Sequence, residues 1–226
     1  GQRASAAALA ALGAKLREYN ETYAIMDLVL FQQAMEHVCR IARIIVNPTG
    51  NAMLIGVGGS GKQSLTRLAA FICDMEVRQL SVTSKFKVDD LKEFLMELYK
   101  SAGIKGIPTA FIMTDSQIVD ERFLVLINDF LSSGWVPDLF PADELDAVFS
   151  ALRNEAKAAG VPDSPKTMLE FFVQRVRANL HLTLCFSPGS NMPNAGETTS
   201  QRLQFFFSSI FGTNRNVART CPVFSM

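Results

Sequence analysis

Apolar residues recur along this chain at two spacings, and the spacing distinguishes predicted helices from predicted strands. Steps of three and four residues place Leu28, Phe31, Met35 and Val38 on one face, which is typical of an amphipathic helix over residues 28–46. The same spacing predicts further helices over residues 65–72, 89–103, 123–131, 143–159 and 165–179. Short apolar runs bounded by turn residues predict buried strands at residues 52–55, 76–83, 109–114 and 181–186.

Strands that alternate with helices predict an α/β fold, in which a parallel sheet carries helices on both faces. We expect this fold to occupy residues 20–188, with Asp27 capping the first predicted helix. Residues 1–19 are rich in Ala, Leu, Lys and Arg, which favours a peripheral helix or a linker.

The pattern changes after Pro188. Residues 189–200 are rich in Asn, Gly, Thr and Pro, which predicts loop or disorder. The Phe-rich stretch Phe205–Phe211 shows no clear period, so no element is predicted over residues 201–226. We therefore expect residues 189–226 to form a divergent tail.

Composition indicates a globular protein without an obvious charged partner. Hydrophobic residues make up 48% of the 226 residues and charged residues 19%, and the net charge is zero. A neutral chain has no overall field that would attract nucleic acid or an acidic membrane, so neither is an expected partner. No apolar stretch approaches the roughly 20 residues of a transmembrane helix.

The cysteines argue for a reducing compartment. Cys39, Cys73, Cys185 and Cys221 are widely spaced, and the chain has only two histidines, which argues against a structural zinc site. We expect buried free thiols, as in proteins of the cytoplasm. The N-terminal stretch also lacks the features of a secretory signal peptide.

A phosphate-binding loop is the most specific chemical pattern in the chain. The segment Gly56-Val57-Gly58-Gly59-Ser60-Gly61-Lys62 follows a predicted strand and opens a predicted helix. Glycines allow positive φ and bring several N–H groups close to an anion, while the new helix directs its positive end to the same place. ATP or ADP is the expected ligand, with Lys62 contacting its terminal phosphates. The predicted nucleotide-binding residues are Gly56, Gly58, Gly59, Ser60, Gly61, Lys62, Gln63, Ser64, Asp115 and Ser187.

The magnesium site departs from the usual pattern. Gln63 stands where Ser or Thr normally binds Mg²⁺, and it offers an amide oxygen, which is a weaker ligand. Asp115 ends a predicted strand and fits the role of the second, carboxylate ligand. Ser64 is rotated by about 100° round the helix, so it is a poor substitute for the missing hydroxyl.

The catalytic base is the second departure. Ser116 follows Asp115 where many AAA+ ATPases have a Glu that activates water, and general-base catalysis contributes about 10²–10⁴ in rate. Glu121 is a candidate substitute, although a carboxylate in the first turn of a helix is better explained as a partner of the helix dipole.

Ser187 and two arginines leave alternatives open. Ser187 follows the strand 181–186, where it is either a sensor of the terminal phosphate or an ordinary strand exit before Pro188. Arg175 and Arg177 are either solvated cations at a helix end or contacts to a phosphate across a subunit boundary.

Residues 17–188 resemble the fourth AAA+ module of a dynein heavy chain. The resemblance rests on the segment 50–65, on 19–21 and 28–41, and on segments such as 111–118 and 175–188. Gly61-Lys62-Gln63-Ser64 and Thr114-Asp115-Ser116 resemble the axonemal dyneins more than the cytoplasmic ones. The resemblance implies a P-loop AAA+ core within a ring of six linked modules that moves along microtubules, located in the cytoskeleton of a cilium or flagellum.

The resemblance also implies a limited role for this chain. In that family the fourth module binds nucleotide and tunes the ring, and its partners are neighbouring AAA+ modules or other dynein chains, so microtubules are contacted only indirectly. The small helical lid, the stalk and an arginine cluster after Pro188 are not recognisable here, so a fragment, a truncated product and an altered C-terminal frame all remain open.

Three functions are compatible with the residues. The preferred one is a regulatory or structural module that binds ATP or ADP with Mg²⁺ and hydrolyses it weakly or not at all. The second is an active ATP hydrolase with a non-standard base such as Glu121. The third is a free-standing interaction protein with Phe205–Phe211 as its docking surface.

Overall fold

A parallel sheet lies at the centre of the molecule. The computed structural model describes residues 2–83, 85–187 and 223–225. Neighbouring strands in the sheet follow the order β2-β3-β4-β1-β5, and every pair is parallel. Their bounds are Ala52–Ile55 for β1, Glu76–Gln79 for β2, Thr109–Thr114 for β3, Leu180–Phe186 for β4 and Val223–Ser225 for β5.

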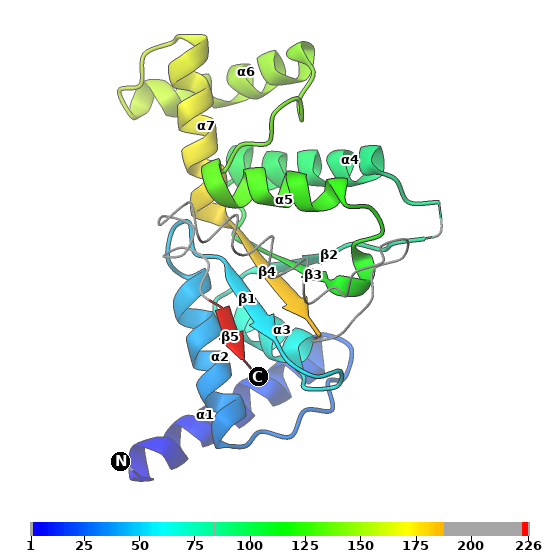
Figure 1. The fold of residues 1–226 in the computed structure, drawn as a ribbon. Helices are drawn as coiled ribbons and strands as arrows, with labels where there is room; N and C mark the ends of the chain where they lie inside the picture. Colours follow the sequence, from blue (N-terminus) through cyan, green and yellow to red (C-terminus); the bar gives the residue numbers. More distant parts are fainter. Residues whose placement is uncertain (1, 84, 188–222, 226) are drawn as a thin grey trace.

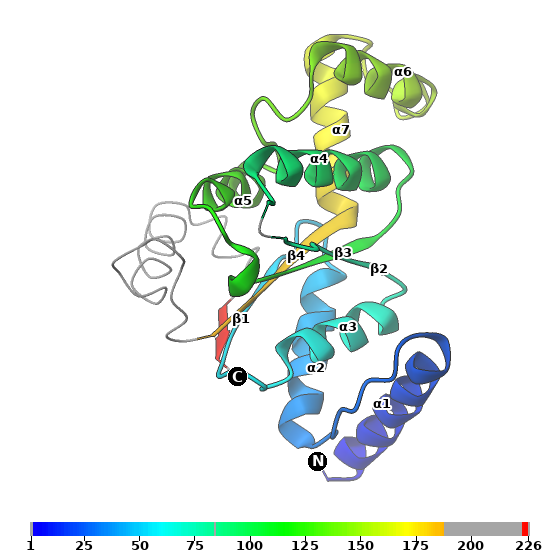
Figure 2. The same ribbon diagram turned by 90° about the vertical axis from the view of Figure 1, so that its right-hand side faces the viewer.

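Helices cover both faces of the sheet, which confirms the predicted α/β architecture (Figure 1). One face carries α1 (Gln2–Thr22), α2 (Gln32–Ile45) and α3 (Lys62–Ile72). The other face carries α4 (Val88–Tyr99), α5 (Arg122–Ser133), α6 (Ala142–Ala158) and α7 (Pro165–Asn179), and Figure 2 shows the two groups on opposite sides of the strands.

Strand β4 contributes side chains to the apolar clusters on both faces of the sheet. Successive side chains of a strand point to opposite faces. Leu182 and Leu184 accordingly pack in the cluster under α4–α7, whereas Cys185 packs in the cluster under α1–α3. Because both faces are covered, all seven residues of β4 are buried, as the continuous apolar run predicts.

Helix α2 begins four residues later than predicted, at Gln32 rather than residue 28. The side chain of Asn20 links the end of α1 to Met26, since it accepts a hydrogen bond from the Met26 N–H at 2.8 Å and donates one to the Met26 carbonyl at 3.3 Å. Phe31, not Asp27, occupies the N-cap position, so the predicted cap is wrong. Of the two alternatives for residues 1–19, a helix is found, and it extends to Thr22.

Strand β2 is shorter than predicted and ends at Gln79 instead of residue 83. The next carbonyl, that of Leu80, accepts a hydrogen bond from the Gln117 side chain at 2.7 Å rather than from a neighbouring strand. The side-chain amide oxygen of Gln117 accepts in turn from the Thr114 N–H at 2.8 Å, which fixes the short 3₁₀ turn η2 (Asp115–Gln117) after β3.

The predicted helix over residues 89–103 is α4 continued by a π-helical turn, η1 (Lys100–Ile104). Arg175 of α7 donates to the carbonyls of Gly103 at 2.6 Å and Ile104 at 3.2 Å, which satisfies the end of this turn. The Phe172 ring lies where a Cβ on Gly103 would be, so only glycine fits this contact.

Strand β5 was not predicted, because the hydrophobic pattern of residues 201–226 has no clear period. Its three residues pair with Met53, Leu54 and Ile55 of β1. The other predictions for the tail, on the loop at 189–200, the Phe-rich stretch and Cys221, concern residues outside the described ranges. Within the described part of the chain, no helix is both long and apolar enough to cross a membrane.

Thr183 on β4 is a polar residue in the apolar layer under α3, and its replacement by valine is expected to stabilise the protein. The residue is fully buried, and its hydroxyl is without a hydrogen-bond partner among the described residues. Thr183→Val should raise the free energy of unfolding by about 1 kcal/mol, because valine fills the same space without a polar group to desolvate.

Urea unfolding of the full chain tests this expectation. Thr66→Val is the matched control, since Thr66 is equally buried but donates a hydrogen bond to the Lys62 carbonyl at 2.8 Å. Equal effects of the two substitutions would contradict the assignment.

Candidate functional site

The site lies at the carboxyl edge of the sheet, where β1 leads into the glycine-rich loop and the loop leads into α3. Parallel α/β sheets bind ligands at this edge. A cavity of about 490 Å³ opens there. Its lining comes from the loop, the start of α3 and the ends of β3 and β4: Gly58, Gly59, Ser60, Gly61, Lys62, Gln63, Ser64, Arg67, Thr114, Asp115, Ser116, Cys185 and Ser187.

The glycines of the loop have the geometry of a phosphate cradle. Gly59 and Gly61 adopt φ of 81° and 79°, a left-handed conformation that strongly favours glycine. A Cβ added to Gly58 or Gly59 would meet nothing within 4 Å, so protein packing is not what demands glycine there. Gly61 is the N-cap of α3, which directs the positive end of that helix at the cavity.

The ammonium group of Lys62 donates hydrogen bonds to this loop. The residue is 8% exposed. Its Nζ donates to the carbonyls of Gly56 at 2.7 Å and Val57 at 2.9 Å and to Ser60 Oγ at 3.2 Å. The three donors of a lysine are thereby directed to the loop, which places a full positive charge at the cavity wall.

Asp115 joins the ends of β3 and β4 below the cavity. One carboxylate oxygen accepts from the Ser116 N–H at 2.9 Å, and the other accepts from the Ser187 N–H at 2.8 Å. The structure therefore brings Asp115 and Ser187 together, beside the loop that carries Lys62. Their roles as magnesium ligand and phosphate sensor remain predictions.

Ser116, which stands at the base position, and Glu121, the candidate substitute, lie in different places. Ser116 lines the cavity, and its hydroxyl is 3.0 Å from that of Thr114. Glu121 is the N-cap residue of α5 and is absent from the described residues that line the cavity. No group of three or more His, Cys, Asp or Glu side chains suited to a metal occurs within the described ranges.

Gln63 lines the cavity beside residues that the sequence analysis did not select. Its amide oxygen accepts a hydrogen bond from Gln79 Nε2 at 3.0 Å, and the Gln79 oxygen accepts from the guanidinium of Arg67. Arg67 was detectable in the sequence, because it lies four residues after Gln63 on the same helix. Gln79 was not detectable, since it reaches the site from strand β2.

Cys185 is a further lining residue that sequence reasoning assigned only to the buried thiols. The cysteine is 2% exposed, and burial raises the pKa of its thiol to about 12. A thiol with this pKa stays protonated at neutral pH and is a poor nucleophile. The expectation of buried free thiols is thus met by Cys185, whereas Cys39 and Cys73 are free but only half-buried.

Neither candidate arginine of α7 is directed at the cavity. Arg175 binds the carbonyls of η1, forms an ion pair with Glu155 and lies over the Phe171 ring. The Arg177 side chain covers Gly134 at the end of α5. Arg175 therefore stabilises this chain's own fold and is not a solvated helix-end cation, whereas Arg177 is the basic residue in the last turn of α7.

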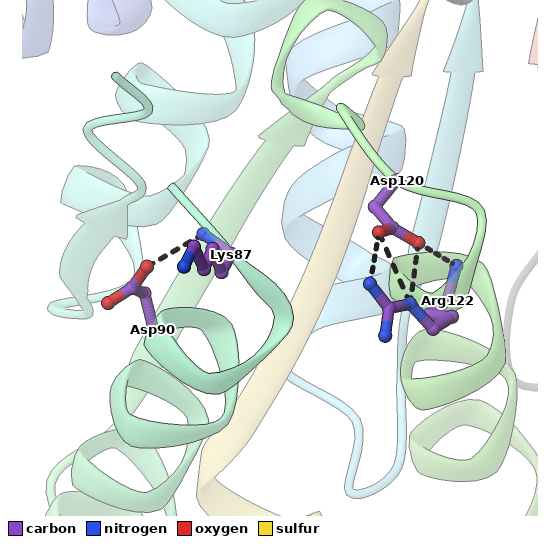
Figure 3. A network of polar contacts seen from close by, with 4 residues as sticks. All are labelled: Lys87, Asp90, Asp120 and Arg122. Atoms are coloured by element: carbon purple, nitrogen blue, oxygen red, sulfur yellow. Dashed lines mark hydrogen bonds and ion pairs between the residues drawn. The ribbon is translucent and has the colours of Figure 1, made fainter. Parts of the chain in front are cut away.

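A second cavity, of about 580 Å³, lies between the start of α4 and the turn before α5. Arg122 in its lining binds both carboxylate oxygens of Asp120, and next to the lining the Asp90 carboxylate accepts from the backbone N–H of Lys87 at 2.7 Å (Figure 3). The bonds from Arg122 lower the pKa of Asp120 to about 2. Glycine does not contribute to its lining, so this cavity lacks a phosphate cradle.

Comparison with known proteins identifies the family of this chain. Residues 26–206 match the family described as the P-loop containing dynein motor region D4, and the match extends past Pro188. The chain is 62% identical over 174 residues to the dynein beta chain of the flagellar outer arm of Chlamydomonas reinhardtii, which covers 77% of this chain. It is 52% identical over 176 residues to dynein axonemal heavy chain 9 of Homo sapiens, which covers 78%. The chain spans 4% of the length of each of these relatives.

Proposed function

This chain belongs to the family of P-loop containing dynein motor regions D4, and from that membership we propose that it is a nucleotide-binding module of an axonemal dynein heavy chain. The proposed ligand is ATP or ADP. The proposed role is structural or regulatory, with weak or no hydrolysis at this site.

The convergence of three positive features on one cavity carries the proposal. The loop N–H groups around Gly58 and Gly59, the N-terminus of α3 and the Lys62 ammonium group all border the same space. A polyphosphate presents several negative oxygens over a short distance, which such a cradle can bind together. The cavity is also bordered by the Asp115 carboxylate, which suits a bound divalent cation better than a second anion.

The cavity offers Mg²⁺ one carboxylate ligand. In nucleotide sites this ion usually binds one or two carboxylates together with substrate phosphates and water. Asp115 supplies one such carboxylate, already oriented by the N–H groups of Ser116 and Ser187. When bound, the ion would neutralise part of the phosphate charge.

Weak hydrolysis is supported by what occupies the position after Asp115. Ser116 has a hydroxyl bonded to Thr114 and cannot accept a proton from water at neutral pH as a carboxylate can. Glu121 is the N-cap residue of α5 and is not among the described residues that line the cavity. Holding nucleotide requires the cradle alone, whereas splitting it requires a base, and among the described lining residues Asp115, assigned here to Mg²⁺, is the one carboxylate.

The names of the relatives also suggest where the protein is located and which partners it has. Flagellar outer-arm and axonemal dyneins are the proteins it resembles. The chain would therefore work in the axoneme of a cilium or flagellum, beside neighbouring AAA+ modules, and would affect microtubules only through them.

Nucleotide titration of the full chain tests the proposal. ADP and ATP are expected to raise the melting temperature with increasing concentration, because a ligand that binds only the folded state stabilises it. At a concentration of one hundred times Kd the gain is about 2.7 kcal/mol, enough for a shift of several degrees. No shift with either nucleotide at millimolar concentration would contradict nucleotide binding.

A further inference from the structure

Three polar side chains form a continuous hydrogen-bond network at the edge of the cavity. Arg67 donates to the amide oxygen of Gln79, and Gln79 Nε2 donates to the amide oxygen of Gln63 at 3.0 Å. Gln63 and Arg67 lie one turn apart on α3 and both line the cavity, while Gln79 ends the neighbouring strand β2. The network thus connects Gln63 to the end of strand β2.

The guanidinium group of Arg67 fixes which groups donate and which accept in this network. Arginine has only donors, so the part of Gln79 that faces Arg67 must be its oxygen. The NH₂ of Gln79 then faces Gln63, and the part of Gln63 that receives it must again be an oxygen. Gln63 is left with its NH₂ group as the end that is not turned to Gln79.

We propose that Arg67 and Gln79 are positioning residues that make Gln63 a hydrogen-bond donor to a nucleotide phosphate instead of a magnesium ligand. The inference rests on the proposed nucleotide binding, and it replaces the expectation that the Gln63 oxygen binds Mg²⁺. Asp115 is then the protein ligand that remains for the ion. Nucleotide binding should consequently depend only weakly on Mg²⁺.

The chemistry of the position favours a donor. Gln63 lies in the first turn of α3, where the helix dipole attracts anionic oxygens. An amide N–H bonded to a phosphate oxygen is charge-assisted and stronger than a neutral pair. The Gln63 oxygen already accepts from the NH₂ group of Gln79, so a metal bound there would have to share this oxygen with that donor.

Replacement of Gln63 by methionine separates the two roles. Methionine has similar length but neither an amide donor nor a carbonyl oxygen. If Gln63 donates to phosphate, Gln63→Met should weaken ADP binding about tenfold to the same extent in Mg²⁺ and in EDTA. If Gln63 binds the metal, affinity should fall in Mg²⁺ and stay unchanged in EDTA. Isothermal titration of the full chain with ADP distinguishes these results.

Replacement of Gln79 by glutamate tests the positioning role. A carboxylate at residue 79 has no donor for the Gln63 oxygen and attracts its NH₂ group, which should turn the oxygen towards the nucleotide. Gln79→Glu is expected to lower ADP affinity in EDTA about tenfold and to make binding respond to Mg²⁺. Gln174→Glu, at an exposed position of α7, is the control for the added charge and should leave both affinities unchanged.

Circular dichroism and the melting temperature establish that each variant folds, and Gln63→Met keeps the test decisive if Gln79→Glu does not. Wild-type binding that is lost in EDTA, or a Gln63→Met effect confined to Mg²⁺, would overturn the inference and leave nucleotide binding intact. An absence of binding in both conditions would overturn the proposed function, and the inference with it.

Discussion

Replacing Lys62 with alanine is expected to weaken ATP and ADP binding by about a hundredfold, because a charge-assisted contact to the terminal phosphates contributes up to about 3 kcal/mol. The ammonium group lies at the cavity wall and is held by Gly56, Val57 and Ser60. Titration of the full chain by calorimetry measures the change directly. Nucleotide should also no longer raise the melting temperature of this variant.

Lys166→Ala is the matched control for Lys62→Ala. Lys166 is an exposed lysine in the first turn of α7, away from the cavity. Its removal should leave both affinities unchanged. Equal affinities of wild type and Lys62→Ala, with both proteins folded, would show that the loop does not bind phosphate.

Replacing Ser116 with glutamate is expected to raise ATP turnover about a hundredfold, since general-base catalysis contributes about 10²–10⁴ in rate. Ser116 lines the cavity next to Asp115, so the new carboxylate would stand at the base position. Release of inorganic phosphate under saturating ATP is the measurement. Ser116→Gln controls for size and should leave turnover at the wild-type level.

Two outcomes would count against this account of Ser116. Unchanged turnover in Ser116→Glu, with ATP binding retained, would show that something other than the base limits hydrolysis. Fast turnover in the wild type that Glu121→Gln abolishes would show that Glu121 acts as the base, in spite of its place at the start of α5.

The strand–loop–helix unit around Lys62 could be predicted from the sequence because its determinants are local. Glycines that must adopt positive φ, a lysine and a following helix lie within a few consecutive residues. The alternation of apolar strands and amphipathic helices likewise identified the parallel sheet and its two helical layers.

Side-chain hydrogen bonds between distant segments could not be predicted. Gln79 reaches Gln63 from another strand, and Arg175 binds the carbonyls of η1 from α7. Each contact joins residues far apart in sequence, where spacing carries no information.

A single-turnover experiment tests most directly whether this module holds nucleotide without splitting it. The full chain, in molar excess over ATP labelled on its terminal phosphate, is sampled over an hour for bound ATP and released phosphate. The account predicts that ATP is retained and that almost all of it stays intact, whereas Ser116→Glu releases phosphate. Rapid phosphate release by the wild type, or failure to retain ATP, would contradict it.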